Sequence, residues 1–208
     1  MQLTEKYRPQ SFADVAGQDK AIEYINSLRK NGLNSRAYWI SGQSGTGKTT
    51  LARLIASEVS TPFATEELDG ADVDKAFIEQ CERQCRYKPM GAQGWCYLVN
   101  ESHGIRGKLI KSMNSLLEQP HVLRNSTWIF TTTTDGQVMF DDLEDAGPFS
   151  SRCTIISLAR RDICRPFAER MVWVAQQEGV ELTVETAIKV LRSNGNNLRA
   201  GLQTIETM

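Results

Sequence analysis

The run Gly42-Gln43-Ser44-Gly45-Thr46-Gly47-Lys48-Thr49 matches every fixed position of the phosphate-binding pattern G-x-x-x-x-G-K-[ST]. An apolar run at 37–40 precedes it and a helical pattern at 49–56 follows, which is the strand–loop–helix order that the pattern requires. The alternative is a glycine-rich turn that matches by chance. Because all the fixed positions and both flanks agree, the sequence predicts a site for a nucleoside triphosphate.

The residue types in this run suit a bound triphosphate. Glycines at 42, 45 and 47 let the backbone place N–H groups around an anion, and the helix that begins there adds its positive end. Lys48 can reach the β and γ phosphates, and the Thr49 hydroxyl can ligate Mg²⁺. The neighbouring Thr50 is a further candidate for nucleotide binding.

The composition is that of an ordinary globular protein. The 208 residues, 40% hydrophobic and 24% charged, can bury one large core or a medium and a small one. No apolar run has the length of a membrane span, and the polar N-terminus does not resemble a signal peptide. The five cysteines form neither an even framework nor a paired zinc spacing. We therefore expect reduced thiols, a cytoplasmic location (nuclear in a eukaryote) and no membrane partner.

The net charge of −1 is unevenly distributed. Lysines and arginines minus aspartates and glutamates give +3 in residues 1–60, −6 in 61–150 and +2 in 151–208. Because a global basic field is lacking, any contact with nucleic acid has to be local and shared with partner subunits. The acidic runs at 66–69 and 141–145 are interpreted as solvated loops.

Helical and strand patterns alternate as far as residue 158. Helical patterns cover 18–30, 47–58, 71–87 and 108–118, and strand patterns cover 38–40, 95–99, 127–132 and 154–158, with a weaker one at 62–67. Such alternation predicts a parallel sheet covered by helices on both faces. The segments 161–178, 184–194 and 198–208 then read as helices, with Gly179 and Gly195 as terminators. We predict an α/β phosphate-loop domain at 1–159 and a small all-helical lid domain at 160–208.

Two polar residues, Asn100 and Glu101, end the strand pattern at 95–99. In phosphate-loop ATPases such a strand delivers an acidic pair to the metal and the attacking water. Glu101 can orient that water or accept its proton; the alternative is an ordinary surface glutamate. Asn100 stands where an aspartate normally supports Mg²⁺, and its amide can bond metal-bound water without adding charge. Losing such a carboxylate commonly costs about 10–100-fold in affinity or activity, so Asn100 leaves the hydrolysis rate open.

The other candidates are weaker as isolated signals. A hydroxyl at the end of the threonine-rich strand 127–132, where Thr133 and Thr134 follow, could bridge the γ phosphate and the water, but threonine is also common in strands for its β-propensity. Arg152 lies between Ser151 and Cys153 and is either a fixed surface residue or a cationic finger. The residue pattern leaves both readings open.

The segment at 5–18, Glu-Lys-Tyr-Arg-Pro-Gln-Ser-Phe-Ala-Asp-Val-Ala-Gly-Gln, resembles the opening box of clamp-loader ATPases. These are the replication factor C small subunits and the bacterial gamma/tau subunits, within the AAA+ superfamily. The phosphate loop, the strand that ends at Glu101, the segment 115–120, the tip at 133–135 and the triplet 151–153 follow in the family's order. The resemblance covers essentially the whole chain. The opening box and the triplet are specific to this branch of the superfamily.

The resemblance implies ATP and Mg²⁺ as cofactors and assigns roles to several residues. Arg8, Pro9 and Val15 would lie near the adenine and help to close the site. Arg152 resembles the arginine finger, which acts in trans on ATP held by the neighbouring subunit. Arg199 resembles the sensor-2 contact to the γ phosphate, although taken alone it reads as a solvated helix residue.

Thr134 resembles the sensor-1 residue.

Three features of the sequence depart from the family pattern. Asn100 replaces the usual aspartate. Asn196 stands where glycine is expected, and asparagine tolerates the left-handed conformation reasonably well. The sequence ends at Met208, before the helical collar that the family carries, which is typical of a truncated chain or of a subunit that assembles weakly.

Three cations follow Glu101 at the start of the helical pattern at 108–118: Arg106, Lys108 and Lys111. Cations are unfavourable at the positive end of a helix, so an anionic partner would explain them, and the matching region of clamp loaders faces primed DNA. The alternative is a solvated basic face.

Together these features predict an ATP-hydrolysing subunit of a DNA sliding-clamp loader, which couples ATP binding and hydrolysis to loading of the clamp on primed DNA in replication. Its partners would be the other subunits of a hetero- or homo-oligomeric ring, the sliding clamp and primer–template DNA. One alternative is a nucleotide-binding but weakly hydrolysing structural subunit that donates the finger, for which Asn100 is the reason. Another is a different AAA+ machine, such as a helicase loader or a branch-migration motor, against which the opening box and the triplet 151–153 argue.

Overall fold

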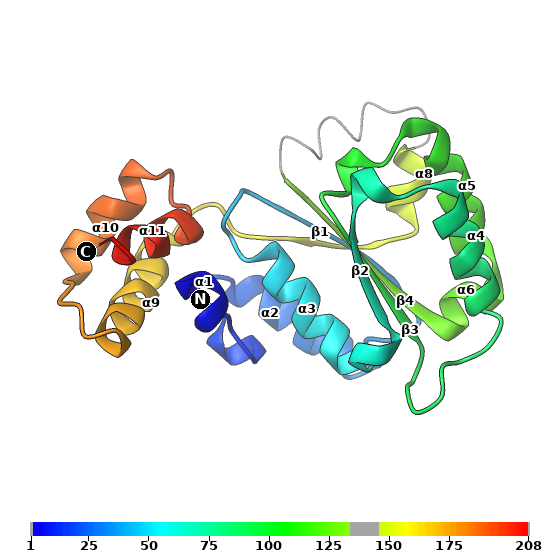
Figure 1. The fold of residues 1–208 in the computed structure, drawn as a ribbon, viewed down its shortest axis with the longest axis horizontal. Helices are drawn as coiled ribbons and strands as arrows, with labels where there is room; N and C mark the ends of the chain where they lie inside the picture. The colour runs from blue at the N-terminus through cyan, green and yellow to red at the C-terminus, as the bar shows by residue number, and fades with distance from the viewer. Residues whose placement is uncertain (1, 134–145, 208) are drawn as a thin grey trace.

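The computed structural model describes residues 2–133 and 146–207 (Figure 1). Within those ranges five parallel strands form one sheet in the order β2-β3-β4-β1-β5. The strands are β1 (Ala37–Gly42), β2 (Thr65–Asp69), β3 (Trp95–Asn100), β4 (Ser126–Thr133) and β5 (Thr154–Ser157). The α/β phosphate-loop fold predicted from the alternating patterns is therefore confirmed.

Helices cover both faces of the sheet. Alternate residues of β1 point to opposite faces, as a strand requires, so Tyr38 and Ile40 enter one core and Trp39 enters the other. The first core also contains side chains of α2 (Asp19–Arg29) and α3 (Lys48–Val59). The second is aromatic, with the rings of Tyr97 and Trp128 stacked at 4.4 Å. It is covered by α4 (Lys75–Gln84), α5 (Gly107–Glu118), α6 (Pro120–Asn125) and α8 (Ala146–Ser151).

The register of the sheet brings the carboxyl ends of the strands together. Gly42 of β1 lies beside Thr133 of β4, and Asn100 of β3 lies beside Asp69 of β2. The loops that follow β1 and β3 therefore leave the same edge of the sheet. In open parallel sheets this edge is where ligands bind.

A separate core holds the C-terminal helices α9 (Cys164–Gln177), α10 (Val184–Ser193) and α11 (Leu198–Ile205). They lie at one end of the molecule, beside the N-terminal helix α1 (Leu3–Lys6), and the sheet lies at the other end (Figure 1). Leu3 and Tyr7 of the N-terminal segment pack into this helical core rather than onto the sheet. The division into domains at 159/160 stays a prediction.

The predicted terminators of these helices have the backbone that was expected of them. Gly179 follows α9 with φ 72°, and Gly195 follows α10 with φ 62°. Asn196 has φ 58°, so asparagine does adopt the left-handed conformation there. Thr183 and Asn197 cap α10 and α11 by accepting hydrogen bonds from backbone N–H groups of the first turn.

Two predictions from the sequence need correction. The acidic run at 66–69 is not a loop, because it belongs to the edge strand β2, whose charged side chains face solvent and α3. The helix predicted at 71–87 is shorter, since Gly70–Asp72 forms a 3-10 turn and Asp74 caps a helix that begins at Lys75. The second acidic run, 141–145, lies outside the described residues.

Candidate functional site

The phosphate-binding loop joins β1 to α3 and has the backbone that its glycines permit. Gly45 and Gly47 have φ of 74° and 99°, in the left-handed region that glycine enters without strain. Helix α3 begins at Lys48, so its first N–H groups face the loop. A row of backbone donors and the positive end of a twelve-residue helix thus surround the position expected for a phosphate.

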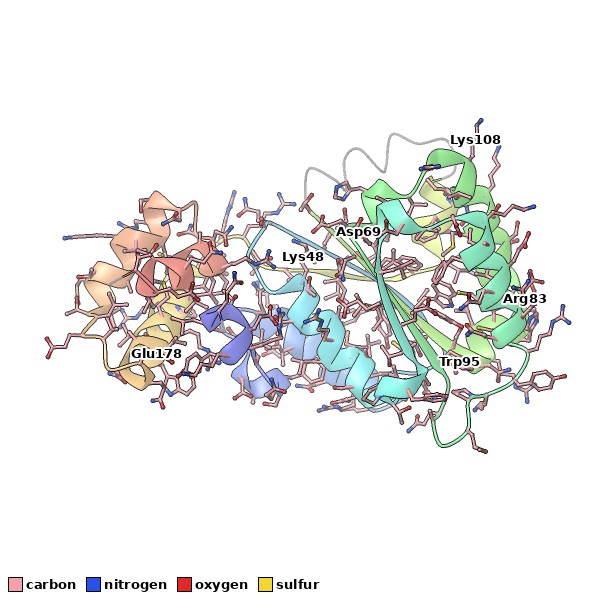
Figure 2. The ribbon with its side chains drawn as sticks, in the orientation of Figure 1. Lys48, Asp69, Arg83, Trp95, Lys108 and Glu178 are labelled. Atoms are coloured by element: carbon pink, nitrogen blue, oxygen red, sulfur yellow. The ribbon has the colours of Figure 1, made fainter. Side chains whose placement is uncertain are left out.

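Lys48 is the buried cation of this loop. Lys48 is only 6% exposed, and its Nζ donates a hydrogen bond to the carbonyl of Gln43 at 3.0 Å. Burial lowers the pKa of Lys48, and the nearby Glu101 carboxylate partly opposes that change. A buried ammonium group is stabilised by a neighbouring anion, which a bound phosphate would supply. Figure 2 shows Lys48 where the sheet end of the molecule meets the helical end.

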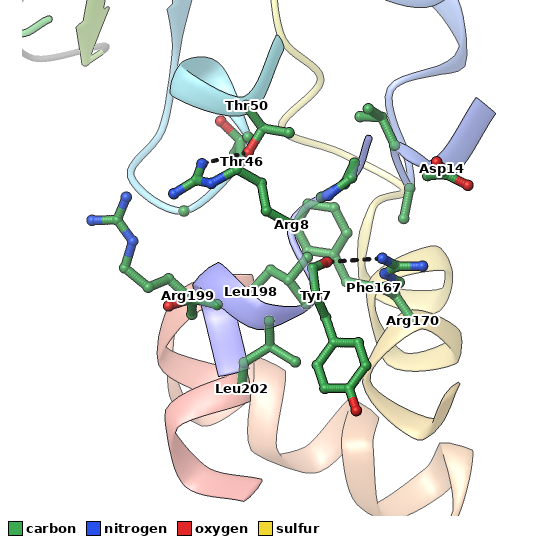
Figure 3. A pocket seen from close by; sticks show the side chains of 16 residues that line it. Tyr7, Arg8, Asp14, Thr46, Thr50, Phe167, Arg170, Leu198, Arg199 and Leu202 are labelled. Atoms are coloured by element: carbon green, nitrogen blue, oxygen red, sulfur yellow. Dashed lines mark hydrogen bonds between the residues drawn. The ribbon is translucent and has the colours of Figure 1, made fainter. Parts of the chain in front are cut away.

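A cleft lies between the loop and the helical unit (Figure 3). Its lining comes from the N-terminal segment, the phosphate-binding loop and the helices α3, α9 and α11. The lining residues are Thr4, Tyr7, Arg8, Pro9, Asp14, Val15, Ala16, Gly45, Thr46, Gly47, Thr50, Phe167, Arg170, Leu198, Arg199 and Leu202.

This cleft brings together most of the nucleotide-binding candidates named from the sequence. Arg8 donates from Nη1 to the Thr50 hydroxyl at 3.0 Å, which ties the opening segment to α3. Pro9 and Val15 line the same cleft, and Arg199 reaches it from α11 on the opposite side. Five candidates do not line this cleft: Gly42, Gln43, Ser44, Lys48 and Thr49. Of these, Lys48 and Thr49 are the first two residues of α3.

The helical unit contacts the loop directly. A Cβ atom on Gly45 would overlap the side-chain oxygen of Asn197, which caps α11. Gln18 makes a second link: its Oε1 accepts from the backbone N–H of Ala159 at 2.7 Å, and its Nε2 donates to the carbonyl of Thr46 at 3.4 Å. The position of the helices is therefore coupled to the conformation of the loop.

A hydrogen-bond network joins α3 to the ends of β2, β3 and β4. The Thr49 hydroxyl donates to Asn100 Oδ1 at 3.3 Å, and Thr131 donates to the same oxygen at 3.1 Å. On the other side of the amide, Asn100 Nδ2 donates to Glu67 Oε1 at 2.7 Å. Arg53 holds that carboxylate through Nε at 2.9 Å and Nη2 at 3.0 Å.

The two metal candidates, Thr49 and Asn100, are therefore neighbours. Their contacting atoms are a hydroxyl and an amide oxygen, which are hard donors of the kind that Mg²⁺ takes beside nucleotide phosphates and water. The residues fit a nucleotide-bound magnesium ion. No group of three histidine, cysteine, aspartate or glutamate side chains able to hold a metal occurs in the described residues, so phosphates and water would supply the remaining ligands.

Glu101 has an uncommon backbone. It follows β3 with φ 45° and ψ 49°, and left-handed residues other than glycine concentrate at functional sites. Gly70 makes room for the turn, since a Cβ there would lie 2.6 Å from the Glu101 carbonyl oxygen. The Glu101 side chain is 42% exposed, and His103 Nδ1 lies 3.5 Å from its carboxylate and 3.2 Å from the Thr132 hydroxyl.

Arg152 lies away from this chain's own loop. It precedes β5, whose other end lies beside Ser41, just before the loop. Its guanidinium donates to the carboxylate of Glu118 at the end of α5 and to the carbonyl of Pro148. The predicted sensor, Thr134, lies outside the described residues.

The three cations proposed to contact DNA are exposed at one end of the molecule. Arg106 precedes α5, and Lys108 and Lys111 belong to it. Figure 2 shows Lys108 projecting outward from the sheet end, away from Lys48. The first turn of α5 contains no acidic residue that would offset these charges.

Sequence reasoning missed several residues of the cleft and of the network. Arg170 lines the cleft, donates to the Tyr7 carbonyl at 2.9 Å and lies 4.3 Å from the Trp173 ring centroid; burial lowers its pKa. Only the tertiary fold brings it there from α9. Glu67 had a usable signal, because a charged residue on a strand pattern beside the strand of Asn100 reaches the same edge.

Comparison with known proteins identifies the family of the chain. The model of the ATPase family associated with various cellular activities (AAA) matches residues 38–160, more than half of the chain, so the chain belongs to this family. The DNA polymerase III subunit tau/gamma of Haemophilus influenzae is 26% identical over 96% of the chain, and the replication factor C large subunit of Thermococcus kodakarensis is 24% identical over 98%. The chain spans only 31% and 40% of those relatives.

The fold also resembles solved structures. A variant of Thermotoga maritima RuvB superposes with a TM-score of 0.73 at 19% identity, covering 97% of this chain and 65% of that one. At this identity the likeness concerns the fold alone. Every helix in 2–133 and 146–207 is too short or too polar to cross a membrane.

Proposed function

We propose that this chain binds ATP with Mg²⁺ in the cleft and hydrolyses it as a subunit of a DNA sliding-clamp loader. The observation that carries the proposal is the meeting of Arg8, Gly47 and Arg199 around one cleft. Three segments far apart in the sequence converge there, as a nucleotide site between an α/β unit and a helical lid requires. The similarity to DNA polymerase III tau/gamma and replication factor C subunits over nearly the whole chain supports the replication role.

In the proposed reaction the loop amides and Lys48 bind the β and γ phosphates, while Thr49 and Asn100 hold the metal side of the site. Bound Mg²⁺ neutralises charge on the phosphates. Glu101 orients a water molecule whose oxygen attacks the γ phosphorus. The Glu101 carboxylate accepts the proton that this water loses. The bond from the γ phosphorus to the bridging oxygen breaks, which leaves ADP and inorganic phosphate.

Arg152 would act on the nucleotide of a neighbouring subunit. Support comes from its place at the end of β5 remote from its own loop and from its pairing with Glu118 in the single chain. In a ring it would exchange this carboxylate for the γ phosphate. Such a finger raises the rate by about 10³–10⁵-fold in related systems.

The decisive experiment measures steady-state ATP turnover with Mg²⁺, with and without primer–template DNA and a sliding clamp, in a complex that contains the partner subunits. We expect turnover that rises when DNA and clamp are added together. Stimulation by a helicase, with none by clamp and DNA, would assign the chain to another replication machine.

The weakly hydrolysing alternative has one observation in its favour, the uncharged Asn100. Because Asn100 Nδ2 lies 2.7 Å from Glu67 Oε1, an aspartate at position 100 would face the Glu67 carboxylate. The test therefore combines Asn100→Asp with Glu67→Gln. A large gain in turnover favours the weakly hydrolysing subunit, and unchanged turnover favours the active ATPase.

A further inference from the structure

The side-chain amide of Asn100 can be placed in two ways that differ by a 180° flip. In one, Oδ1 faces the hydroxyls of Thr49 and Thr131 and Nδ2 faces Glu67; in the other, these atoms exchange places. The Thr49 and Thr131 hydroxyls do not favour either orientation of the amide, because each hydroxyl can donate or accept a hydrogen bond. The orientation is therefore decided by whatever lies on the other side of the amide.

Glu67 is that deciding group. An ionised carboxylate only accepts hydrogen bonds, so the flipped amide would set Oδ1 against Glu67 Oε1 at about the 2.7 Å that now separates Nδ2 from it. Arg53 fixes the carboxylate by two hydrogen bonds, at 2.9 and 3.0 Å. Hydrogen bonds therefore run in one chain from the Arg53 guanidinium through Glu67 and Asn100 to the Thr49 hydroxyl in the first turn of α3.

The fold makes this chain of bonds compact. Thr49 and Arg53 are four residues apart on α3 and so share a face of the helix. Glu67 lies beside Leu98 in the parallel register, and Asn100, two residues further along β3, points to the same face of the sheet as Leu98. The Glu67 side chain is 30% exposed, which leaves it partly shielded from solvent.

We propose that Glu67 is a positioning residue for the magnesium side of the nucleotide site. It holds the Asn100 amide with its oxygen towards Thr49, and its negative charge polarises that amide so that Oδ1 becomes a better acceptor or ligand. A flipped amide would present N–H groups to a cation instead. The inference rests on the proposed function, because it concerns how the chain binds nucleotide with Mg²⁺ when position 100 is an asparagine.

The proposal predicts that Glu67→Gln has opposite effects in two backgrounds. With Asn100 present, Arg53 attracts the oxygen of the introduced glutamine, which leaves the amide nitrogen of that glutamine to face Asn100 and favours the flipped orientation. With Asn100→Asp, the wild-type Glu67 instead opposes a second carboxylate, and like charges at this distance disfavour each other. Removing the Glu67 charge then helps the site. A glutamate whose task is only to pair with Arg53 gives the same effect in both backgrounds.

The experiment measures the affinity of the ATP analogue AMP-PNP by calorimetry, in Mg²⁺ and in EDTA, for the parent, Glu67→Gln, Asn100→Asp and the double variant. The ratio of the two affinities reports the magnesium contribution without any turnover. We expect Glu67→Gln to lower this ratio by about 10-fold in the parent background, the smaller end of the range for partners of metal ligands, and to raise it in the Asn100→Asp background. Glu66→Gln removes the same charge from the neighbouring residue of β2 and is expected to leave the ratio unchanged.

A ratio that Glu67→Gln leaves unchanged, or lowers equally in both backgrounds, would overturn the inference while leaving the proposed function intact. A parent chain that binds AMP-PNP equally well in Mg²⁺ and EDTA, or fails to bind it, would overturn both. Circular dichroism establishes that each variant folds. If Glu67→Gln does not fold, Glu67→Leu carries the same comparison, because it also removes the acceptor.

Discussion

Lys48→Met separates the role of the buried lysine in binding from its role in folding. Methionine keeps an unbranched chain of similar length and removes the ammonium group. In the folded protein burial lowers the pKa of Lys48 below 10.5, so the folded state binds its proton less tightly than the unfolded chain does. Below its folded-state pKa the charged Lys48 therefore lowers the free energy of unfolding. This destabilisation disappears as the pH rises from the folded-state pKa towards 10.5. We expect the ligand-free variant at pH 7 to be at least as stable as the parent.

Lys48→Met should greatly weaken nucleotide binding, although it does not lower the stability of the ligand-free protein. A hydrogen bond to a charged group contributes about 1.5–3 kcal/mol, so two such bonds from Lys48 to phosphate oxygens at the lower value account for about 3 kcal/mol, or roughly 150-fold in affinity. An ATP analogue at about 100 times the parent Kd stabilises the parent by about 2.7 kcal/mol. For a chain of this size that shifts Tm by about 5–10 °C. At the same concentration the variant would shift by about 1 °C.

The assay is thermal unfolding of both proteins with and without AMP-PNP and Mg²⁺, with calorimetric titration for the Kd values. A variant whose Kd stays within a few-fold of the parent would refute the assigned contact between Lys48 and phosphate. A ligand-free variant that is several degrees less stable would refute the argument from burial.

Glu101→Gln should leave AMP-PNP affinity unchanged and stop turnover; turnover at the parent rate in a phosphate-release assay would mean that another group activates the water. Arg152→Ala should spare nucleotide binding by its own subunit and reduce hydrolysis in the assembled complex by orders of magnitude, whereas an equal loss in the isolated chain would contradict action in trans. Gly45→Ala combines a positive φ with overlap onto Asn197, so it should weaken AMP-PNP binding, while Gly147→Ala, which meets no neighbour, should not; equal affinities would argue against coupling between loop and lid.

Much of the fold could be predicted because its signals are local. The glycines of the loop, the apolar run before it and the helical pattern after it are contiguous in the sequence, and the structure places β1 and α3 there. Gly179 and Gly195 ended the helical patterns where the backbone does turn left-handed. The edge strand β2 was misread in part because its side chains are acidic and one face meets solvent, so composition obscured the strand.

The short helices and the long-range contacts were beyond the sequence patterns. Helices α1, α6 and α8 span four to six residues, too few to be stable without tertiary packing, so periodicity does not reveal them. The contacts of Asn100 with Glu67, of Arg170 with the Tyr7 carbonyl and of Asn197 with Gly45 join residues 33 to 163 positions apart. These pairings depend on strand order and on where the helical unit packs, which a single sequence does not specify.

The most direct test of the central claim is a crystal structure of the chain with AMP-PNP and Mg²⁺. We expect the triphosphate among the N–H groups that follow Gly42, the base between Val15 and the helical unit, and the Arg199 guanidinium directed at the terminal phosphate. An empty cleft at saturating analogue, or a bound analogue with Arg199 turned towards solvent, would contradict it.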